Sequence, residues 1–176
     1  MELVPTAIAG AFRLQRQPLA DARGSFARTF CADAFAAAGI DFRIAQMSLS
    51  RNPHRHTLRG LHGQAPPHEE AKLVQCVRGR IFDVAVDVRP ESPSRGRWVG
   101  VELAGAGDTS FYIPPGCLHG FLTLEPDSDV LYHMGAAFVA GVGIGARFDD
   151  PAFGIVWPAA PAVISDRDAT YADFAL

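Results

Sequence analysis

Two adjoining runs of strand-forming residues constrain the fold of this chain most strongly. KLVQCVRG and RIFDVAVDV, within residues 72–88, are rich in branched apolar side chains and meet at Arg78-Gly79. A break of this kind between two such runs predicts a β-hairpin. In the second run the even-numbered residues from Phe82 to Val88 are all apolar, whereas Asp83 and Asp87 share the opposite face. Because side chains alternate along a strand, this pattern predicts one core face and one face that carries two carboxylates.

Shorter strand-like stretches follow, at residues 97–103, 109–113, 120–124 and 130–134, separated by turn-rich pieces such as RPESPSRG and EPDSD. Short strands at such intervals are typical of an all-β sandwich or barrel. One short helix is predicted at ADAFAAA, residues 32–38, where Gly39 ends it. The Pro- and Asp-rich tail from Asp149 is expected to wrap the sandwich as loops and a short turn. A length of 176 residues predicts a single domain over residues 1–176.

Charge and cysteine usage exclude several classes of protein. Sixteen Lys and Arg against nineteen Asp and Glu leave a net charge of −3, with no run of five or more like charges, so neither a nucleic acid nor a membrane surface is an expected partner. No leader and no long apolar segment is evident. Cys31, Cys76 and Cys117 are odd in number and widely spaced. They form neither a disulfide framework nor a thiolate zinc site, and they indicate a reducing, cytoplasmic setting.

The histidines are the first candidates for a functional site. His54-x-His56 could place two imidazoles on one face of a strand, and PPGCLHG presents His119 as metal-binding cupin barrels present their last histidine. The carboxylate that such a site needs about four residues after the histidine pair is replaced by Gly60. We therefore expect no bound metal and interpret His54 and His56 as exposed loop residues. A metal-dependent cupin enzyme that uses these three histidines is the alternative.

A second cluster lies in RGLHGQAPP and at Lys72. Arg59, His62, Gln64 and Lys72 fall within fourteen residues. An arginine can clamp an anion, a histidine is a base near neutral pH, and a lysine can stabilise an enolate. The cluster indicates chemistry on an anionic substrate, although surface loops also collect such residues.

Five separated segments together resemble the dTDP-4-dehydrorhamnose 3,5-epimerase family. They are DARGSF (residues 21–26), LRGLHGQAPP (58–67), KLVQCVRGRIFDVAVDVRPESPSRGRW (72–98), YIPPGCLHGFLTL (112–124) and SDRD (165–168). The resemblance implies a cupin-type double-stranded β-helix, or jelly roll, without a cofactor and usually a homodimer. It also implies epimerisation at C3, C5 or both of a nucleotide-linked 4-keto-6-deoxyhexose.

The resemblance assigns catalytic roles to four residues. The C4 ketone acidifies the hydrogens on C3 and C5, so that a base can remove one and an acid can return a proton to the opposite face. The family's base corresponds to His62 and the base's carboxylate partner to Asp168. The acid corresponds to Tyr132, whose phenol has an ordinary pKa near 10. Lys72 corresponds to the lysine beside the developing C4 oxyanion, where a fixed cation stabilises an enolate.

The resemblance also assigns binding residues. Arg23 and Arg59 correspond to arginines that hold the substrate at its diphosphate. His119 corresponds to a substrate-contacting histidine with Asp83 as its carboxylate neighbour, while His68 and His133 are expected at the surface. Further substrate contacts map, on the nucleotide side, to Phe26, Arg28, Gln46, Ser48 and Phe138.

Several nucleotide-side positions depart from the family pattern. Arg28 replaces a glutamate, Ser48 an asparagine, and Gly143 a substrate-contacting glutamate. Phe138 stands where a tyrosine commonly stacks on thymine, and keeps the ring without the hydroxyl. The identity of the nucleotide, dTDP or another, therefore stays open. The same departures motivate another alternative, a sugar-nucleotide binding or scaffold protein without catalysis.

Overall fold

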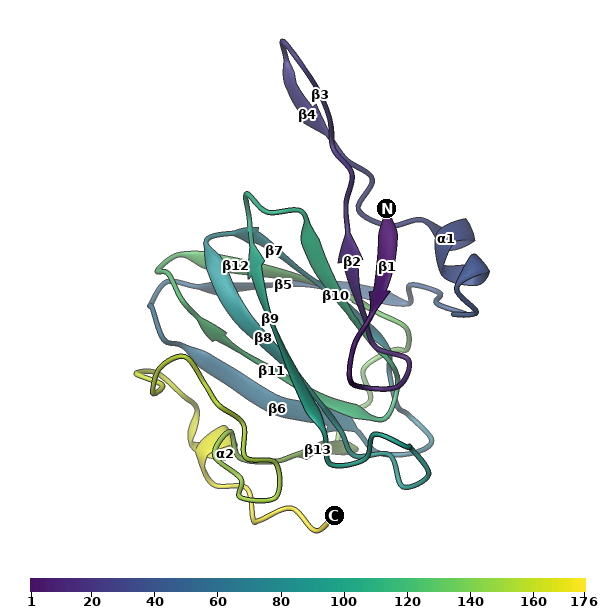
Figure 1. Ribbon diagram of the computed structural model, residues 1–176. Coiled ribbons are helices and arrows are strands. Elements are labelled where there is room, and N and C mark those ends of the chain that lie inside the picture. Colours follow the sequence, from purple (N-terminus) through teal and green to yellow (C-terminus); the bar gives the residue numbers. More distant parts are fainter.

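Two antiparallel β-sheets pack face to face in the computed structural model, which describes residues 1–176 (Figure 1). The six-stranded sheet has the order β1 (Glu2–Pro5), β2 (Phe12–Gln15), β10 (Thr109–Ile113), β7 (Lys72–Arg78), β12 (Ser128–Met134) and β5 (Gln46–Asn52). The five-stranded sheet has the order β13 (Gly143–Gly145), β6 (Leu58–Gln64), β11 (Cys117–Thr123), β8 (Arg80–Asp87) and β9 (Trp98–Ala104). The remaining elements are the hairpin β3 (Leu19–Asp21) and β4 (Gly24–Phe26), and the helices α1 (Ala32–Ala37) and α2 (Asp166–Ala169).

This arrangement confirms the predicted jelly roll and its central hairpin. β7 ends at Arg78 and β8 begins at Arg80, with Gly79 between them at a φ of 70°. A side chain at Gly79 would meet Ser128, so both the turn and the neighbouring strand require glycine here. The predicted strands beyond residue 96 and the helix at residue 32 are also present, with ends shifted by up to three residues.

The prediction for β8 was wrong in one respect, because both of its faces are buried. Ile81 and Ala85, on the same face as the two aspartates, belong to the core between the sheets. Val84 and Val86 face outward, yet they are fully buried under the C-terminal segment. Asp83 therefore points into the interior of the sandwich, and this interior holds the polar site described below.

Each sheet is covered on its outer face as well. Helix α1 brings Phe35 onto the six-stranded sheet, where it packs against Phe42 and Tyr112. The tail brings Phe153 onto the five-stranded sheet, as the sequence predicted.

The two helices are too short to span a membrane, and no helix of the chain meets the requirement for a membrane span.

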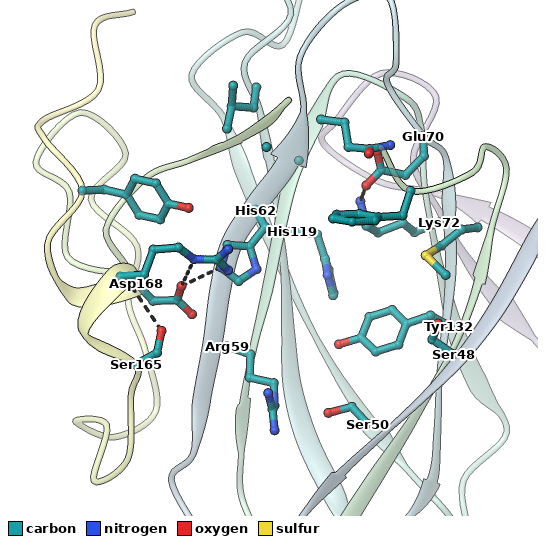
Figure 2. A pocket seen from close by; sticks show the side chains of 18 residues that line it. Ser48, Ser50, Arg59, His62, Glu70, Lys72, His119, Tyr132, Ser165 and Asp168 are labelled. Carbon is teal, nitrogen blue, oxygen red and sulfur yellow. Dashed lines mark hydrogen bonds and ion pairs between the residues drawn. The ribbon is translucent and has the colours of Figure 1, made fainter. Parts of the chain in front are cut away.

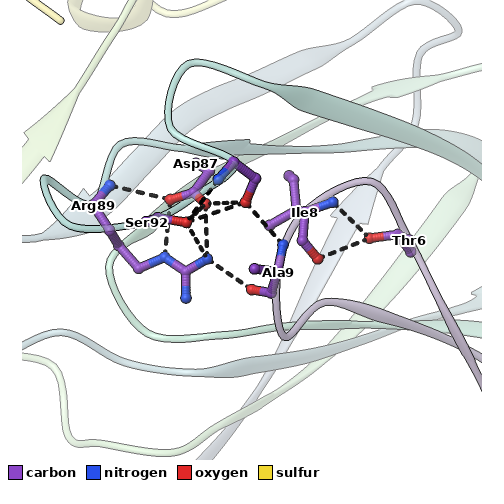
Figure 3. A network of polar contacts seen from close by, with 7 residues as sticks. Thr6, Ile8, Ala9, Asp87, Arg89 and Ser92 are labelled. Atoms are coloured by element: carbon purple, nitrogen blue, oxygen red, sulfur yellow. Dashed lines mark hydrogen bonds and ion pairs between the residues drawn. The ribbon is translucent and has the colours of Figure 1, made fainter.

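A buried carboxylate fastens the N-terminal segment to the end of β8 (Figure 3). Asp87, which is fully buried, accepts hydrogen bonds from the Arg89 guanidinium at 2.8 and 2.9 Å and from Ser94 Oγ at 2.6 Å. Arg89 donates to the carbonyl oxygen of Ala9 at 2.7 Å, and Ser94 Oγ accepts from the Ala9 N–H at 2.8 Å. Burial acts to raise the Asp87 pKa, but these bonds outweigh it and hold the pKa far below its usual value.

Candidate active site

A cleft of about 650 Å³ opens between the two sheets, and residues of α2 line one side of it. Residues from β5, β7 and β12 of the six-stranded sheet line it, together with residues from β6, β11 and β13 of the five-stranded sheet. Because inward-pointing side chains of both sheets meet here, residues far apart in the sequence become neighbours. Figure 2 shows the cleft with His62 and Asp168 on one side and Lys72 and Tyr132 on the other.

His62 and Asp168 form an imidazole–carboxylate pair. His62 Nε2 lies 2.7 Å from Asp168 Oδ1, and Asp168 Oδ2 accepts the N–H of Gly60 at 3.1 Å. Ser165 caps α2 by accepting the N–H of Asp168, which fixes the carboxylate at the start of the helix. Since a carboxylate only accepts, the neutral imidazole donates Nε2–H to it, and Nδ1 keeps the free lone pair.

Opposing effects act on the ionisation of this pair. Burial lowers the pKa of His62, and Asp168 only partly compensates. The Arg167 guanidinium, whose Nη2 lies 2.9 Å from His62 Nε2, lowers that pKa further. Burial would raise the Asp168 pKa, but the hydrogen bonds from His62 and Gly60 outweigh it and lower that pKa. At neutral pH the pair is thus a neutral imidazole held by an ionised carboxylate, which is a suitable general base.

A second imidazole–carboxylate pair lies beside the first. His119 on β11 is directly opposite His62 on β6, and His119 Nε2 lies 2.7 Å from Asp83 Oδ1. This confirms the predicted contact between His119 and Asp83. The second pair is far more enclosed, since the His119 side chain is 5% exposed and that of His62 is 33% exposed. Burial raises the pKa of Asp83.

Tyr132 and Lys72 form the wall opposite His62. The Tyr132 ring packs edge-on against His119, with 5.6 Å between ring centroids, and Figure 2 shows its hydroxyl pointing into the cleft. Burial raises the Tyr132 pKa well above 10, so the phenol remains protonated. Lys72 is nearly buried, and its Nζ is paired with Glu70. This wall thus presents a proton donor and a cation.

The predicted binding residues divide into two groups. Arg59, Ser48 and Phe138 line the cleft with the residues above. Arg59 is oriented by Asn52, whose side-chain oxygen accepts from Arg59 Nε at 2.8 Å. Gln46 does not line the cleft; its side-chain oxygen instead accepts the N–H of Phe138 at 2.8 Å.

Arg23, Phe26 and Arg28 lie outside the cleft of their own chain. Arg23 and Phe26 belong to the β3–β4 hairpin, which projects from the body of the molecule (Figure 1). Arg23 is paired with Asp21 on the same hairpin, and Arg28 contacts the thiol of Cys31 at 3.8 Å. No residue of this hairpin therefore contributes to the cleft of the same chain.

A model of the dTDP-4-dehydrorhamnose 3,5-epimerase family matches residues 5–175. The chain belongs to this family. A dTDP-4-dehydrorhamnose 3,5-epimerase of Sinorhizobium fredii is 40% identical over 151 residues, which are 85% of this chain and 77% of the relative.

Solved structures of the family agree with the fold. The dTDP-4-dehydrorhamnose 3,5-epimerase of Elizabethkingia anophelis has a TM-score of 0.95 at 30% identity, and the match spans 99% of this chain and 96% of the Elizabethkingia chain. A Legionella pneumophila epimerase in complex with dTDP-4-keto-L-rhamnose has a TM-score of 0.88 at 34% identity, and the match spans 95% of this chain and 89% of the Legionella chain. A 3'-monoepimerase of Streptomyces bikiniensis in complex with dTDP-quinovose has a TM-score of 0.85 at 35% identity, with coverages of 93% and 83%.

The structure separates the histidines of the metal-dependent alternative. His54 and His56 lie in the turn between β5 and β6, not on a strand, and neither lines the cleft that contains His119. No group of three or more His, Cys, Asp or Glu side chains is arranged to hold a metal ion. The prediction that His133 lies at the surface was wrong, because its side chain is buried beside β7, with Nδ1 3.4 Å from the carbonyl oxygen of Leu73.

The sequence did not reveal several residues of this epimerase-family cleft. Arg167 lies within SDRD, next to the proposed catalytic aspartate, but only the tertiary contact with His62 indicates a role for it. Glu70 was not singled out either, although its spacing of two residues from Lys72 in an extended segment places the two side chains on one face and was a usable signal for their pairing. The other unassigned lining residues include Ser50, Met134 and Tyr171.

Proposed function

We propose that this chain epimerises a dTDP-linked 4-keto-6-deoxyhexose at C3, C5 or both, as one domain over residues 1–176. The observation that carries the proposal is the placement of one imidazole–carboxylate pair, His62 and Asp168, across a single cleft from Tyr132 and Lys72. Membership of an epimerase family and similarity to an enzyme solved with dTDP-4-keto-L-rhamnose support the same chemistry.

The reaction follows from the acidity of carbons next to a ketone. His62 removes the proton from C3 or C5, and the electron pair moves into a bond with C4 while the charge moves to the C4 oxygen. The Lys72 ammonium stabilises that oxyanion more than the neutral ketone, which lowers the barrier. Tyr132 then returns a proton from the opposite wall of the cleft, so the configuration is inverted. His62 then releases its proton to water and Tyr132 takes one up from water, which resets both groups for the next turnover.

We assign the remaining cleft residues to substrate binding. Arg59 is suited to the diphosphate, because a guanidinium pairs well with phosphate oxygens. His119 and Ser48 lie close enough to the reacting groups to contact the sugar. Phe138, which is 71% exposed at the rim, offers a ring for stacking on the nucleotide base, and Gln46 holds its backbone. Screening dTDP, UDP, GDP and CDP by thermal shift tests the base, with the largest stabilisation expected for dTDP.

A homodimer accounts for the projecting hairpin. Leu19 and Phe26, which pair across it, are 76% and 77% exposed, and Met47 and Leu49 on the edge strand β5 are 58% and 47% exposed. Apolar side chains this exposed are typical of an interface. In the proposed dimer the hairpin brings Arg23 and Phe26 to the partner's cleft, with Arg28 beside it.

Light scattering on a sizing column tests the dimer directly. The expected mass is twice 18.9 kDa, and the alanine variant of Arg23 should weaken dTDP binding without changing that mass. A monomer at micromolar concentration would contradict the proposal.

Three free thiols, of which Cys76 and Cys117 are buried with pKa values raised to about 11 and about 12, suit a reducing cytoplasmic location.

Deuterium incorporation tests the reaction itself. The protein is incubated in D2O with dTDP-4-keto-6-deoxyglucose, and label at C3 and C5 is followed by NMR. Label at both carbons is expected for a 3,5-epimerase, and label at one carbon identifies a monoepimerase. If the nucleotide sugar binds but neither carbon exchanges, the protein is a binding protein and the proposed reaction is wrong.

A further inference from the structure

One carboxylate of the cleft has an oxygen that no protein atom satisfies. Glu70 lines the cleft, its side chain is only 9% exposed, and its Oε1 is paired with Lys72 Nζ (Figure 2). Its Oε2 is buried and has no hydrogen-bond partner in the chain. A buried carboxylate oxygen without a donor is costly, so a donor on the bound substrate would offset that cost.

The chemistry of the sugar determines which donor this is. The inference rests on the proposed function, in which the Lys72 ammonium lies beside the C4 oxygen. Glu70, being bound to Lys72, then lies next to a substituent of a carbon adjacent to C4. On the C5 side that carbon carries a methyl group and the ring oxygen, neither of which donates a hydrogen bond. On the C3 side it carries a hydroxyl, which does.

We propose that Glu70 is a specificity-determining residue that accepts a hydrogen bond from the C3 hydroxyl of the 4-keto-6-deoxyhexose. Lys72 and Glu70 together bind two neighbouring oxygens of the sugar, the ammonium at C4 and the carboxylate at C3. The pairing of the two side chains presents cation and acceptor side by side, which matches the vicinal ketone and hydroxyl.

This contact distinguishes proton removal at C3 from proton removal at C5. When His62 takes the C3 proton, the electron pair forms a C3–C4 double bond and the hydroxyl on C3 becomes an enol hydroxyl, a stronger donor than an alcohol. Its bond to Glu70 therefore strengthens in the transition state, which accelerates the step. When the C5 proton is removed, the C3 hydroxyl stays on a saturated carbon. Repulsion between Glu70 and the enolate is similar in both cases, because both place the charge on the C4 oxygen.

The test is Glu70→Gln, which keeps an oxygen for Lys72 and replaces the second acceptor by an amide NH2. Glu69→Gln is the matched control, since Glu69 is the next residue in the chain, loses the same charge and does not line the cleft. Both variants and the parent protein are incubated in D2O with dTDP-4-keto-6-deoxyglucose. The ratio of the C3 to the C5 labelling rate should fall severalfold in Glu70→Gln, because the strengthening of the bond during C3 proton removal is lost, and stay unchanged in Glu69→Gln.

An unchanged ratio in Glu70→Gln overturns the inference, whether both rates fall together or neither falls. A second measurement needs no variant to fold: the Kd of the unmodified protein for dTDP-6-deoxyglucose is compared with that for its 3-deoxy analogue. About tenfold weaker binding of the analogue is expected, and equal affinity overturns the inference. If the unmodified protein labels neither carbon, the proposed reaction has failed instead; in that case, or when only one carbon is labelled, the analogue comparison decides the role of Glu70.

Discussion

His62 and His119 lie directly opposite each other in the pairing of β6 with β11, and each imidazole is bound through Nε2 to a carboxylate at 2.7 Å. The two pairs differ in exposure, because His62 opens onto the cleft whereas His119 is enclosed by β8 and Tyr132. Proton transfer needs direct access to the reacting carbon. This difference is the physical reason for assigning the base to His62 and a binding role to His119.

Replacing the base should abolish turnover without unfolding the protein. His62→Asn keeps a donor for Asp168 but removes the basic nitrogen, so deuterium exchange at C3 and C5 should fall about a thousandfold. The melting temperature should change by less than about 5 °C, because a side chain that is one-third exposed at the edge of a cleft contributes little packing. His56→Asn is a suitable control, since His56 is outside the cleft and asparagine tolerates its φ of 58°. Near-normal exchange in His62→Asn would assign the base elsewhere.

Removing the acid should uncouple exchange from inversion. Tyr132→Phe leaves His62 able to remove a proton and to return a deuteron to the same face, so label should enter the sugar while its configuration is retained. The Tyr132 hydroxyl forms no hydrogen bond within the chain, and the variant should therefore keep its stability. NMR of the labelled sugar reports both label and stereochemistry. If exchange disappears as well, Tyr132 acts before or during proton removal.

The pH dependence of kcat/KM should report on His62. The residue acts as a base only when neutral, so the rate should rise with pH and be half-maximal below pH 6.5, because burial and Arg167 lower the His62 pKa from that ordinary value. In Arg167→Gln the cation 2.9 Å from Nε2 is absent, which should move the midpoint to higher pH. A midpoint that stays in place or moves to lower pH would show that Arg167 does not act on the base.

The buried Asp87 should control stability at acid pH. Its folded pKa lies below the ordinary 3.8, so the ionised carboxylate stabilises the fold fully above about pH 5, and this contribution is lost as the pH falls through 3.8 towards the folded value. Asp87→Asn should lower the free energy of unfolding by about 3 kcal/mol at pH 7, since it leaves Arg89 without its partner. Urea melts at pH 7 and pH 3.5 measure both effects, and the variant should lose less stability than the parent between them.

A matched exposed pair provides the control for Asp87. Asp149 is paired with Arg147 at 3.0 Å, but its side chain is 56% exposed. Asp149→Asn should change the unfolding free energy by less than about 1 kcal/mol, as is usual for exposed ion pairs. Equal losses in the two variants would mean that burial is not what makes the Asp87 network important.

Some elements could be predicted from the sequence and others could not. The hairpin around Gly79 and the strand at Thr109–Ile113 follow from alternating apolar residues and turn residues. Strand β5 was missed, because it lies at a sheet edge and five of its seven residues are exposed, so the apolar alternation that marks a strand is weak. The burial of the outer face of β8 was missed because the tail that covers it lies some 65 or more residues later in the chain.

Local patterns were therefore sufficient for the all-β class, the central hairpin and the residue types suited to acid–base chemistry, because strand alternation and turn geometry depend only on neighbouring residues. Resemblance to a family supplied the pairing of His62 with Asp168, and folding brings these residues together across 106 positions of sequence. Only the tertiary structure placed Arg167 on that pair, left an oxygen of Glu70 without a partner, and moved the hairpin with Arg23 away from its own cleft. Such features depend on which strands pair and which faces become buried, and these are properties of the whole chain.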